Sequence, residues 1–408
     1  MSGEVARRNV RLLSLFWFLR EFQLWIPVWI VYLTLERGFS FSQVTAAEAL
    51  FLIGVLVLEV PTGAVADRYG RRVSLALGAA SLASSVTIFA FTTSPVVLFA
   101  SFAWWAVATT LMSGADLALL FDTLKAAGRE AEYERLAGRG QAIAWAGVGL
   151  ATLFGGPVAA VLDIRATILF GATTCVVASV TAFLLVEPPR MAERRDGLRG
   201  YAASMGEAFR EAWSRSAVRY LLLFFGVTVA GIETVHYLVQ PYLVENGIEV
   251  GPLFSLLQVP LFAAGMGGAL VAAPLERRFG AMRGLVGLSV GGLAMLAGLA
   301  LSPTLWLYGG LPLLMAVNSC AWPLVTGAVN RQVSSERRAT VLSIGSMVLS
   351  VSMAVLVPFI GWAVDVRGVG AAFALGAVVT ASGMLVFGPA ALGAWRNRPE
   401  TALAAGRT

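Results

Sequence analysis

The sequence has few charged residues, two cysteines and one histidine, and each shortage excludes a class of protein. With 13% charged and 58% hydrophobic side chains, a chain of 408 residues lacks the polar surface to cover a water-soluble globule. Cys175 and Cys320 lie in apolar stretches, so we expect neither a disulfide framework nor a metal site. One histidine limits acid–base catalysis, and the sequence contains no nucleotide-binding loop, metal-ligand cluster or nucleophile elbow. We therefore expect a membrane protein that is not an enzyme and uses no cofactor.

Long apolar runs indicate transmembrane helices. Each approaches the roughly 20 residues that a helix needs to cross about 30 Å of hydrocarbon. Because the first run is long and lacks a small-residue cleavage site, we interpret it as a span and not as a signal peptide. The pattern predicts an all-α integral membrane protein with twelve transmembrane helices, at residues 12–35, 43–66, 73–93, 95–119, 139–162, 166–186, 218–243, 252–275, 284–302, 304–328, 339–364 and 370–394.

The basic residues follow this topology, which accounts for the net charge of +6 without a nucleic-acid partner. Twenty-six of the thirty Lys and Arg fall in segments that share one side of the membrane. Arg37, Arg165 and Arg367 fall on the other side, and Arg20 lies within a span. The positive-inside rule then places both termini in the cytoplasm and requires an even number of spans. We expect a multi-pass protein of the cell (inner or plasma) membrane.

The chain divides into two similar halves. Residues 188–217 open with two prolines, are rich in arginine and are predicted to form a cytoplasmic linker, in which 201–213 could be a surface helix. The linker would separate six-helix bundles at 1–187 and 218–408. A shift of about 210 residues places Tyr32 on Tyr242, and the turn after the second span on the turn after the eighth. Parallel halves of this kind place the substrate site between them, near the bilayer midplane.

The loop between the second and third spans carries an ordered motif of turn glycines, an aspartate and basic residues that can pair with the aspartate or with helix C-terminal carbonyls. Its members are Gly63, Asp67, Arg68, Gly70, Arg71 and Arg72. A positive-inside loop would explain the arginines but not the ordered Gly, Asp and Gly. The motif resembles the Gly-x-x-x-Asp-Arg-x-Gly-Arg-Arg pattern of the major facilitator superfamily, and a degraded second copy lies at 276–283. The resemblance implies two pseudo-symmetric six-helix bundles that rock to alternate access, with Asp67 and the loop arginines gating the cytoplasmic side.

Two further stretches, residues 59–63 and 113–122, look like the proton-coupled multidrug-efflux-like branch of that superfamily. The antiporter glycine pattern of the fifth span survives only in part, as Gly147, Gly149, Gly155 and Gly156 followed by Pro157. The arginine usually found in the fourth span is missing, and two threonines occupy that neighbourhood. Coupling groups for proton-driven export must then lie partly elsewhere. Glu59, close to the loop motif, is expected to gate or lock the bundles more than to contact cargo.

Ionisable residues within spans are candidates for function, because an embedded charge costs some kilocalories. Arg20 and Glu21 lie in the first span, Asp116 in the fourth and Glu233 in the seventh. Under the repeat, Glu233 lies near the level of Glu21, so each half would bring to a central cavity a carboxylate that can load and release a proton. His236 shares the Glu233 face, as a packing residue or as part of a proton relay. Arg20 and Glu21 could instead pair structurally, and Asp116 could serve coupling or structure.

Aromatic and amide side chains could line a sparsely charged cavity for amphipathic ligands; they are Trp17, Trp25, Gln240, Gln258, Asn318 and Trp322. The expected function is secondary active transport by a monomer in the lipid bilayer, with protons as the coupling ion and a small lipophilic or amphipathic compound as the exported substrate. An unpaired Arg20 would favour an anion, so the alternative is uptake or exchange of a small organic anion on the same fold. A non-transporting sensor is a third class, but no appended signalling domain supports it.

Overall fold

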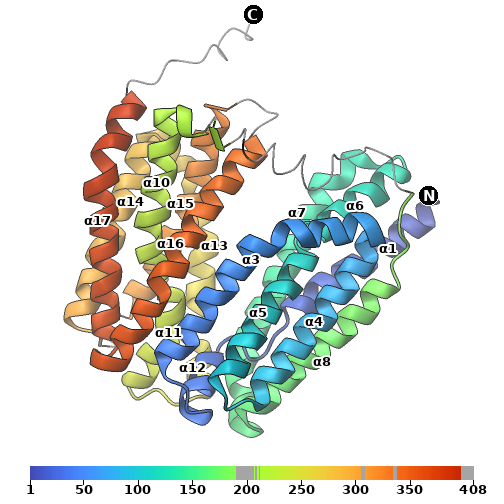
Figure 1. Ribbon diagram of the computed structural model, residues 1–408, viewed down its shortest axis with the longest axis horizontal. Coiled ribbons are helices and arrows are strands. Elements are labelled where there is room, and N and C mark those ends of the chain that lie inside the picture. Colours follow the sequence, from blue (N-terminus) through green and yellow to red (C-terminus); the bar gives the residue numbers. More distant parts are fainter. Residues whose placement is uncertain (190–205, 207–208, 211, 305–307, 334–337, 397–408) are drawn as a thin grey trace, which may run out of the picture. The chain divides into compact units, whose positions relative to one another are not determined.

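The computed structural model describes the chain apart from residues 190–205, 207–208, 211, 305–307, 334–337 and 397–408. The described residues form helices joined by short turns (Figure 1). They divide into two compact units: unit 1 comprises Met1–Tyr201 and Leu243–Val259, and unit 2 comprises Ala202–Tyr242 and Pro260–Thr408. The linker expected at 188–217, with its surface helix at 201–213, lies largely outside the described residues, and the expected bundle boundaries stay a prediction.

Unit 1 begins with the helix α1 (Gly3–Glu21), followed by two short elements, α2 (Trp29–Val31) and the π-helical turn η1 (Tyr32–Glu36). Longer helices follow: α3 (Phe41–Tyr69), α4 (Arg71–Phe91), α5 (Pro95–Met112), α6 (Ala115–Ala126), α7 (Tyr133–Val161) and α8 (Ile164–Phe183), with a 3-10 turn η2 (Glu130–Glu132) before α7. α4 packs against α5 and α8, α3 against α5, and α1 against α7 and α8. α12 (Pro252–Leu256) also belongs to this unit and packs against α7.

Unit 2 contains α10 (Ser216–Glu233), α13 (Val259–Phe279), α14 (Ala281–Leu301), α15 (Gly310–Asn330), α16 (Arg338–Arg367) and α17 (Val369–Arg396). α11 (Val235–Glu245) crosses the unit boundary at Tyr242. α17 packs against α10, α14 and α16, and α10 packs against α15 and α16. The buried side chains of Leu221, Phe225 and Val325 lie in the core that these contacts enclose.

Within the described residues, eleven helices are long and apolar enough to cross a membrane. They correspond to the second to twelfth expected spans, so the predicted all-helical membrane fold is confirmed. The first expected span, 12–35, differs because its helix stops after Glu21 and resumes only at Trp29. Its α1 part also carries Arg20 and Glu21, which lower the hydropathy of the segment.

The turns after α3 and α13 occupy equivalent positions in the predicted repeat. Gly70 has a φ of 103° and precedes α4, and Gly280 has a φ of 78° and precedes α14. Side chains other than glycine are strained at such positive φ values. Both turns therefore explain why glycine stands at these two places in the motif and its second copy.

Tyr32 and Tyr242, which the repeat also pairs, have the same role in their own units. Both are fully buried. The Tyr32 hydroxyl donates to the Ala90 carbonyl at 2.5 Å, and the Tyr242 hydroxyl donates to the Thr304 carbonyl. Each tyrosine thus ties the first span of its half to the end of the third.

Candidate functional site

Two helix breaks of unit 1 meet at a group of charged side chains. α1 ends at Glu21, with Arg20 in its last turn, and the main chain then stays non-helical up to α2. The fourth expected span is interrupted at Gly114, whose φ is 68°, and α6 begins directly after it. Asp116 therefore lies in the first turn of α6, where the positive end of the helix dipole favours a carboxylate, and Arg20 lies where the negative end of α1 favours a cation.

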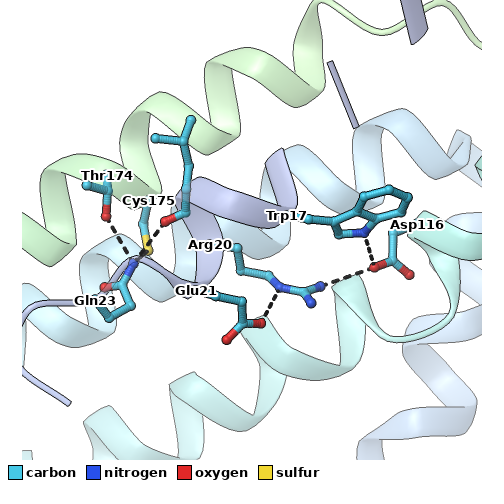
Figure 2. A network of polar contacts seen from close by, with 8 residues as sticks. Trp17, Arg20, Glu21, Gln23, Asp116, Thr174 and Cys175 are labelled. Carbon is cyan, nitrogen blue, oxygen red and sulfur yellow. Dashed lines mark hydrogen bonds and ion pairs between the residues drawn. The ribbon is translucent and has the colours of Figure 1, made fainter. Parts of the chain in front are cut away.

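Arg20 joins two carboxylates, as Figure 2 shows. Its Nε donates to Glu21 Oε1 at 2.8 Å and its Nη1 donates to Asp116 Oδ2 at 3.2 Å. Trp17 Nε1 donates to the same Asp116 oxygen at 2.8 Å. We call Arg20, Glu21 and Asp116 the helix-break cluster. With all three groups ionised, the cluster has two negative charges against one positive charge.

The two carboxylates of the helix-break cluster differ in exposure and in the number of donors. The Asp116 side chain is 10% exposed and accepts bonds from Arg20, Trp17 and the N–H of Leu117. The Glu21 side chain is 31% exposed, and its contact in the cluster is the bond from Arg20. Asp116 is therefore the fixed member of the cluster, and Glu21 is the member that solvent can reach.

A buried amide holds the non-helical segment after α1 in place (Figure 2). Gln23 Nε2 donates to Thr174 Oγ1 at 3.0 Å and lies 3.3 Å from Cys175 Sγ, while Gln23 Oε1 accepts from Trp25 Nε1 at 2.9 Å. The Trp25 ring packs edge-on against Trp105, with centroids 5.4 Å apart. Trp25, predicted to line a cavity, is 4% exposed and packs inside unit 1.

The glycines of the fifth span let α7 approach the broken first span. A Cβ added at Gly147 would lie 3.0 Å from the Phe18 carbonyl oxygen, and one at Gly155 would lie 2.2 Å from the Leu24 carbonyl oxygen. Gly149 has nothing within 4 Å of an added Cβ. Close packing against the first span therefore accounts for part of the glycine pattern.

Unit 2 has its own helix break beside a carboxylate. α10 ends at Glu233, and α11 begins two residues later. His236 Nδ1 lies 3.7 Å from Glu233 Oε1 and 3.2 Å from the Glu233 carbonyl oxygen. Gln240 lies one turn further along α11 and is buried. The structure thus brings together the two ionisable residues that the sequence pointed to in the seventh span.

The remaining residues predicted to line a cavity are distributed over both units. Gln258, in unit 1, is buried and donates to the Pro27 carbonyl in the non-helical segment at 3.0 Å. In unit 2, the half-buried Trp322 packs on Phe225 with ring centroids 5.5 Å apart, and Asn318 lies one turn before it on α15. Their role toward a ligand stays a prediction.

The loop motif joins α4 to α6 and to the segment that follows α8 in unit 1. Arg71 forms an ion pair with Asp122 of α6, a partner that was not among the predicted site residues. The backbone N–H groups of Arg71 and Arg72, at the start of α4, donate to the two Glu187 carboxylate oxygens at 2.8 and 2.9 Å. Glu187 was also not among the predicted site residues. Asp122 is the last residue of the 113–122 stretch that supports the family resemblance. Its place in that stretch was the signal that could have identified Asp122 as a site residue.

The other members of the motif lie around this turn and on α3. The Arg68 guanidinium lies over the Tyr69 ring, 5.6 Å from its centroid. Glu59 Oε1 accepts a bond from Ser113 Oγ at 3.3 Å. The second copy of the motif in unit 2 contributes a further ion pair, between Glu276 at the end of α13 and Arg331 after α15.

Comparisons with known proteins agree with this architecture. The sequence profile of the Major Facilitator Superfamily matches residues 13–317, more than half of the chain. The chain therefore belongs to the major facilitator superfamily, whose members are membrane transporters and not enzymes. It is 33% identical over 88 residues to the uncharacterized MFS-type transporter YxaM of Bacillus subtilis (strain 168), a match that spans 22% of each chain.

Solved transporter structures match nearly the whole chain. The crystal structure of the nucleoside transporter NupG has a TM-score of 0.78 at 15% identity and covers 97% of this chain and 100% of its own. A bacterial homologue of the human lysosomal transporter Spinster, inward-facing and unoccupied, has a TM-score of 0.78 at 15% identity and covers 98% and 100%. The D-xylose-proton symporter has a TM-score of 0.71 at 16% identity and covers 98% and 99%. At these identities the likeness shows the fold alone.

Proposed function

We propose that this secondary transporter couples the export of a small lipophilic or amphipathic compound to proton entry by alternating access. The observation that carries the proposal is the charge balance of the helix-break cluster. Arg20 contacts both Glu21 and Asp116, so the ionised cluster has an excess of one negative charge. A site with that excess favours a proton or another cation, and discontinuous helices are where transporters of this kind bind their ions.

The two carboxylates have separate roles in the proposal. Asp116, held by Arg20, Trp17 and the first turn of α6, keeps its charge and fixes Arg20 in place. Glu21 is the proton carrier, because it is more exposed and can rotate away from Arg20 without leaving a buried charge behind. When Glu21 takes up a proton, Arg20 and Asp116 balance each other and the cluster becomes neutral. In the proposal, this change of one unit charge triggers the switch of the transporter from access on one side of the membrane to access on the other.

Export of this kind needs a second proton-responsive group and a gate, and the chain offers both. Glu233 and His236 lie together at the helix break of unit 2. We propose that their protonation changes when the cargo binds or leaves. Arg71, with Asp122 and Glu187, connects α4 to α6 and to the segment after α8, and we propose that it gates the cytoplasmic side. The proposal further includes cytoplasmic termini and six-helix bundles at 1–187 and 218–408, in a monomeric transporter of the cell membrane.

The organic-anion alternative depended on an unpaired Arg20. Two carboxylates contact this arginine, so its charge is neutralised before any substrate arrives. An anion would have to displace Glu21 and would then face Asp116 close by. The contacts therefore support a proton or cation at this site more than a carboxylate or phosphate substrate.

The test is ethidium accumulation in cells that express the protein, with and without a protonophore. We expect expression to lower ethidium accumulation and the protonophore to abolish the difference. Glu21→Gln and Glu233→Gln should each reduce the protonophore-sensitive export, because glutamine keeps the shape and loses the exchangeable charge. Glu130→Gln, in the exposed η2 turn, is the matched control and should export normally.

The same cells distinguish the alternative. Export that is unchanged in both glutamine variants, with the same dependence on pH, would show that Glu21 and Glu233 are not the coupling groups. If expression leaves every lipophilic cation unaffected and instead changes uptake of an organic anion in a manner that requires Arg20, the anion function replaces the proposed one.

A further inference from the structure

Glu59 is a charged residue within a membrane-spanning helix that the helix-break cluster does not use. It lies 18 residues after the start of α3 and 10 residues before its end. At 1.5 Å per residue, these separations amount to about 27 Å and about 15 Å. Glu59 also lies 7 residues, about 10 Å, inside the nearer end of the expected membrane span 43–66. The side chain is exposed, and a charge at this depth is a candidate for a role in transport.

The contacts of Glu59 differ from those of the carboxylates that are paired with an arginine. Glu21 and Asp116 share Arg20, Asp122 has Arg71, and Glu276 has Arg331. In the part of the chain that the structure describes, no cationic side chain lies within ion-pair distance of Glu59. The contact of its carboxylate is with the Ser113 hydroxyl at 3.3 Å. A carboxylate at this depth without a cation lacks the partner that would balance its charge.

Open space flanks the Glu59 carboxylate on both helices that approach it. Gly63, one turn further along α3, and Gly114, next to Ser113, have nothing within 4 Å of an added Cβ. Ser113 and Gly114 are both exposed. The surface next to Glu59 is therefore uncovered and accessible to a ligand, and the side chains that border it are small.

Two half-buried aromatic rings lie further along the α3–α5 interface. Phe51 and Trp105 lie eight residues before Glu59 and Ser113, and their ring centroids are 5.2 Å apart. Eight residues of helix correspond to about 12 Å. A molecule with a positive head at Glu59 and an apolar body of that length would lie along α3 and α5 toward these rings. Aromatic rings favour such apolar and cationic groups.

We propose that Glu59 and Ser113 form a cation-binding site of unit 1, which takes the positive head of an amphipathic organic cation. The inference rests on the proposed export function and names its substrate class as monovalent organic cations. Ser113 and Asp116 belong to the same helix break, on either side of Gly114, so a cation at Glu59 lies beside the segment that positions the helix-break cluster. The cation thereby balances a charge that no arginine or lysine of the described chain balances.

Binding to the purified full-length protein tests this site, with tetraphenylphosphonium as the cation. The neutral comparison molecule is triphenylphosphine oxide, which has no net charge and one phenyl ring fewer. We expect Glu59→Gln to weaken tetraphenylphosphonium binding about tenfold, equivalent to about 1.4 kcal/mol, and to change triphenylphosphine oxide binding less than twofold. Glu59→Asp should retain most of the cation affinity, and Ser113→Ala should weaken it by a smaller factor. Glu130→Gln is the charge-matched control. If Glu59→Gln does not fold, the Asp and Ala variants decide the matter by the same comparison.

Equal affinity of the Glu59→Gln protein and the unaltered protein for tetraphenylphosphonium would overturn the site, as would an absence of cation binding by the unaltered protein. Equal losses for the cation and the neutral molecule would also overturn it, since they would point to altered packing and not to charge. If the site fails while protonophore-sensitive export persists, the proposed function stands without it. If charge-dependent binding requires Glu59 but no export occurs, the site stands and the proposed export does not.

Discussion

Removing the cation of the helix-break cluster is the most direct test of its energetics. Arg20→Met leaves Glu21 and Asp116 close together without a counter-charge, and Asp116 is only 10% exposed. Breaking a fully buried ion pair costs about 3–5 kcal/mol; because the Arg20 and Glu21 side chains are 22% and 31% exposed, we expect a loss nearer to about 2 kcal/mol. At roughly 2 °C per kcal/mol for a chain of this size, the apparent melting temperature of the detergent-purified protein should fall by about 4 °C.

Restoring the charge balance should recover most of this loss. In Arg20→Met/Asp116→Asn, one carboxylate is removed together with the cation, so the double variant should be more stable than Arg20→Met alone by about 1 kcal/mol. Arg135→Met, which breaks an exposed ion pair with Glu132 next to η2, should change the melting temperature by less than about 2 °C. If Arg20→Met costs as much in the Asp116→Asn background as in the unaltered protein, Arg20 and Asp116 do not interact energetically and the charge argument for a proton site is wrong.

Three further predictions concern packing, a buried hydrogen bond and pH. A Cβ at Gly140 would lie 2.3 Å from the Trp17 ring, so Gly140→Ala should destabilise the protein by about 1–3 kcal/mol, while Gly149→Ala, with open space around it, should be neutral or slightly stabilising in a thermal melt. Tyr32→Phe removes the hydroxyl bonded to the main chain and should cost about 1 kcal/mol in the same assay. Burial, followed by the neighbouring Asp163, raises the pKa of Glu36 at the end of η1. The folded protein therefore binds this proton more tightly than the unfolded chain, and the stabilisation is lost as pH rises through the folded-state pKa; Glu36→Gln should gain stability relative to the unaltered protein as pH rises, in melts recorded between about pH 4 and pH 8.

Turn positions and spans were predictable because local sequence determines them. Apolar runs of the length of a bilayer define a helix wherever it finally packs, and eleven of the expected spans have helical counterparts. Gly70 and Gly280 were predictable because a positive φ after a helix favours glycine over any other residue. Tyr32 and Tyr242 were found as a repeat, although their shared bond to a carbonyl at the end of the third span could not be derived from sequence spacing.

Partners distant in sequence were not predictable. The motif suggested that its basic residues pair with Asp67 and with helix C-terminal carbonyls. Arg72 does donate to the Leu185 carbonyl just after α8, but Arg71 pairs with Asp122 on another helix and Glu187 caps the start of α4. Arg20 and Asp116, 96 residues apart, were separate candidates in the sequence, and each was left open between a structural and a coupling role. A side chain chooses its partner from tertiary geometry, and hydropathy and spacing contain no information about which helices become neighbours.

The helix-break cluster also explains why the fourth span can lack the arginine that is usually found there. Electrostatics requires a positive charge near Asp116, but it does not require that the charge come from the same helix. In this chain the end of α1, a favourable place for a cation, brings Arg20 to within 3.2 Å of Asp116 from the first span. Gly147 of α7 contributes to the same arrangement, since an added Cβ there would lie 3.0 Å from the Phe18 carbonyl oxygen in the last turn of α1. On this reasoning, Thr109→Arg or Thr110→Arg, each added to Arg20→Gln, should restore export only if the new guanidinium can reach Asp116. Export measured in the two double variants would show which of the two positions does so.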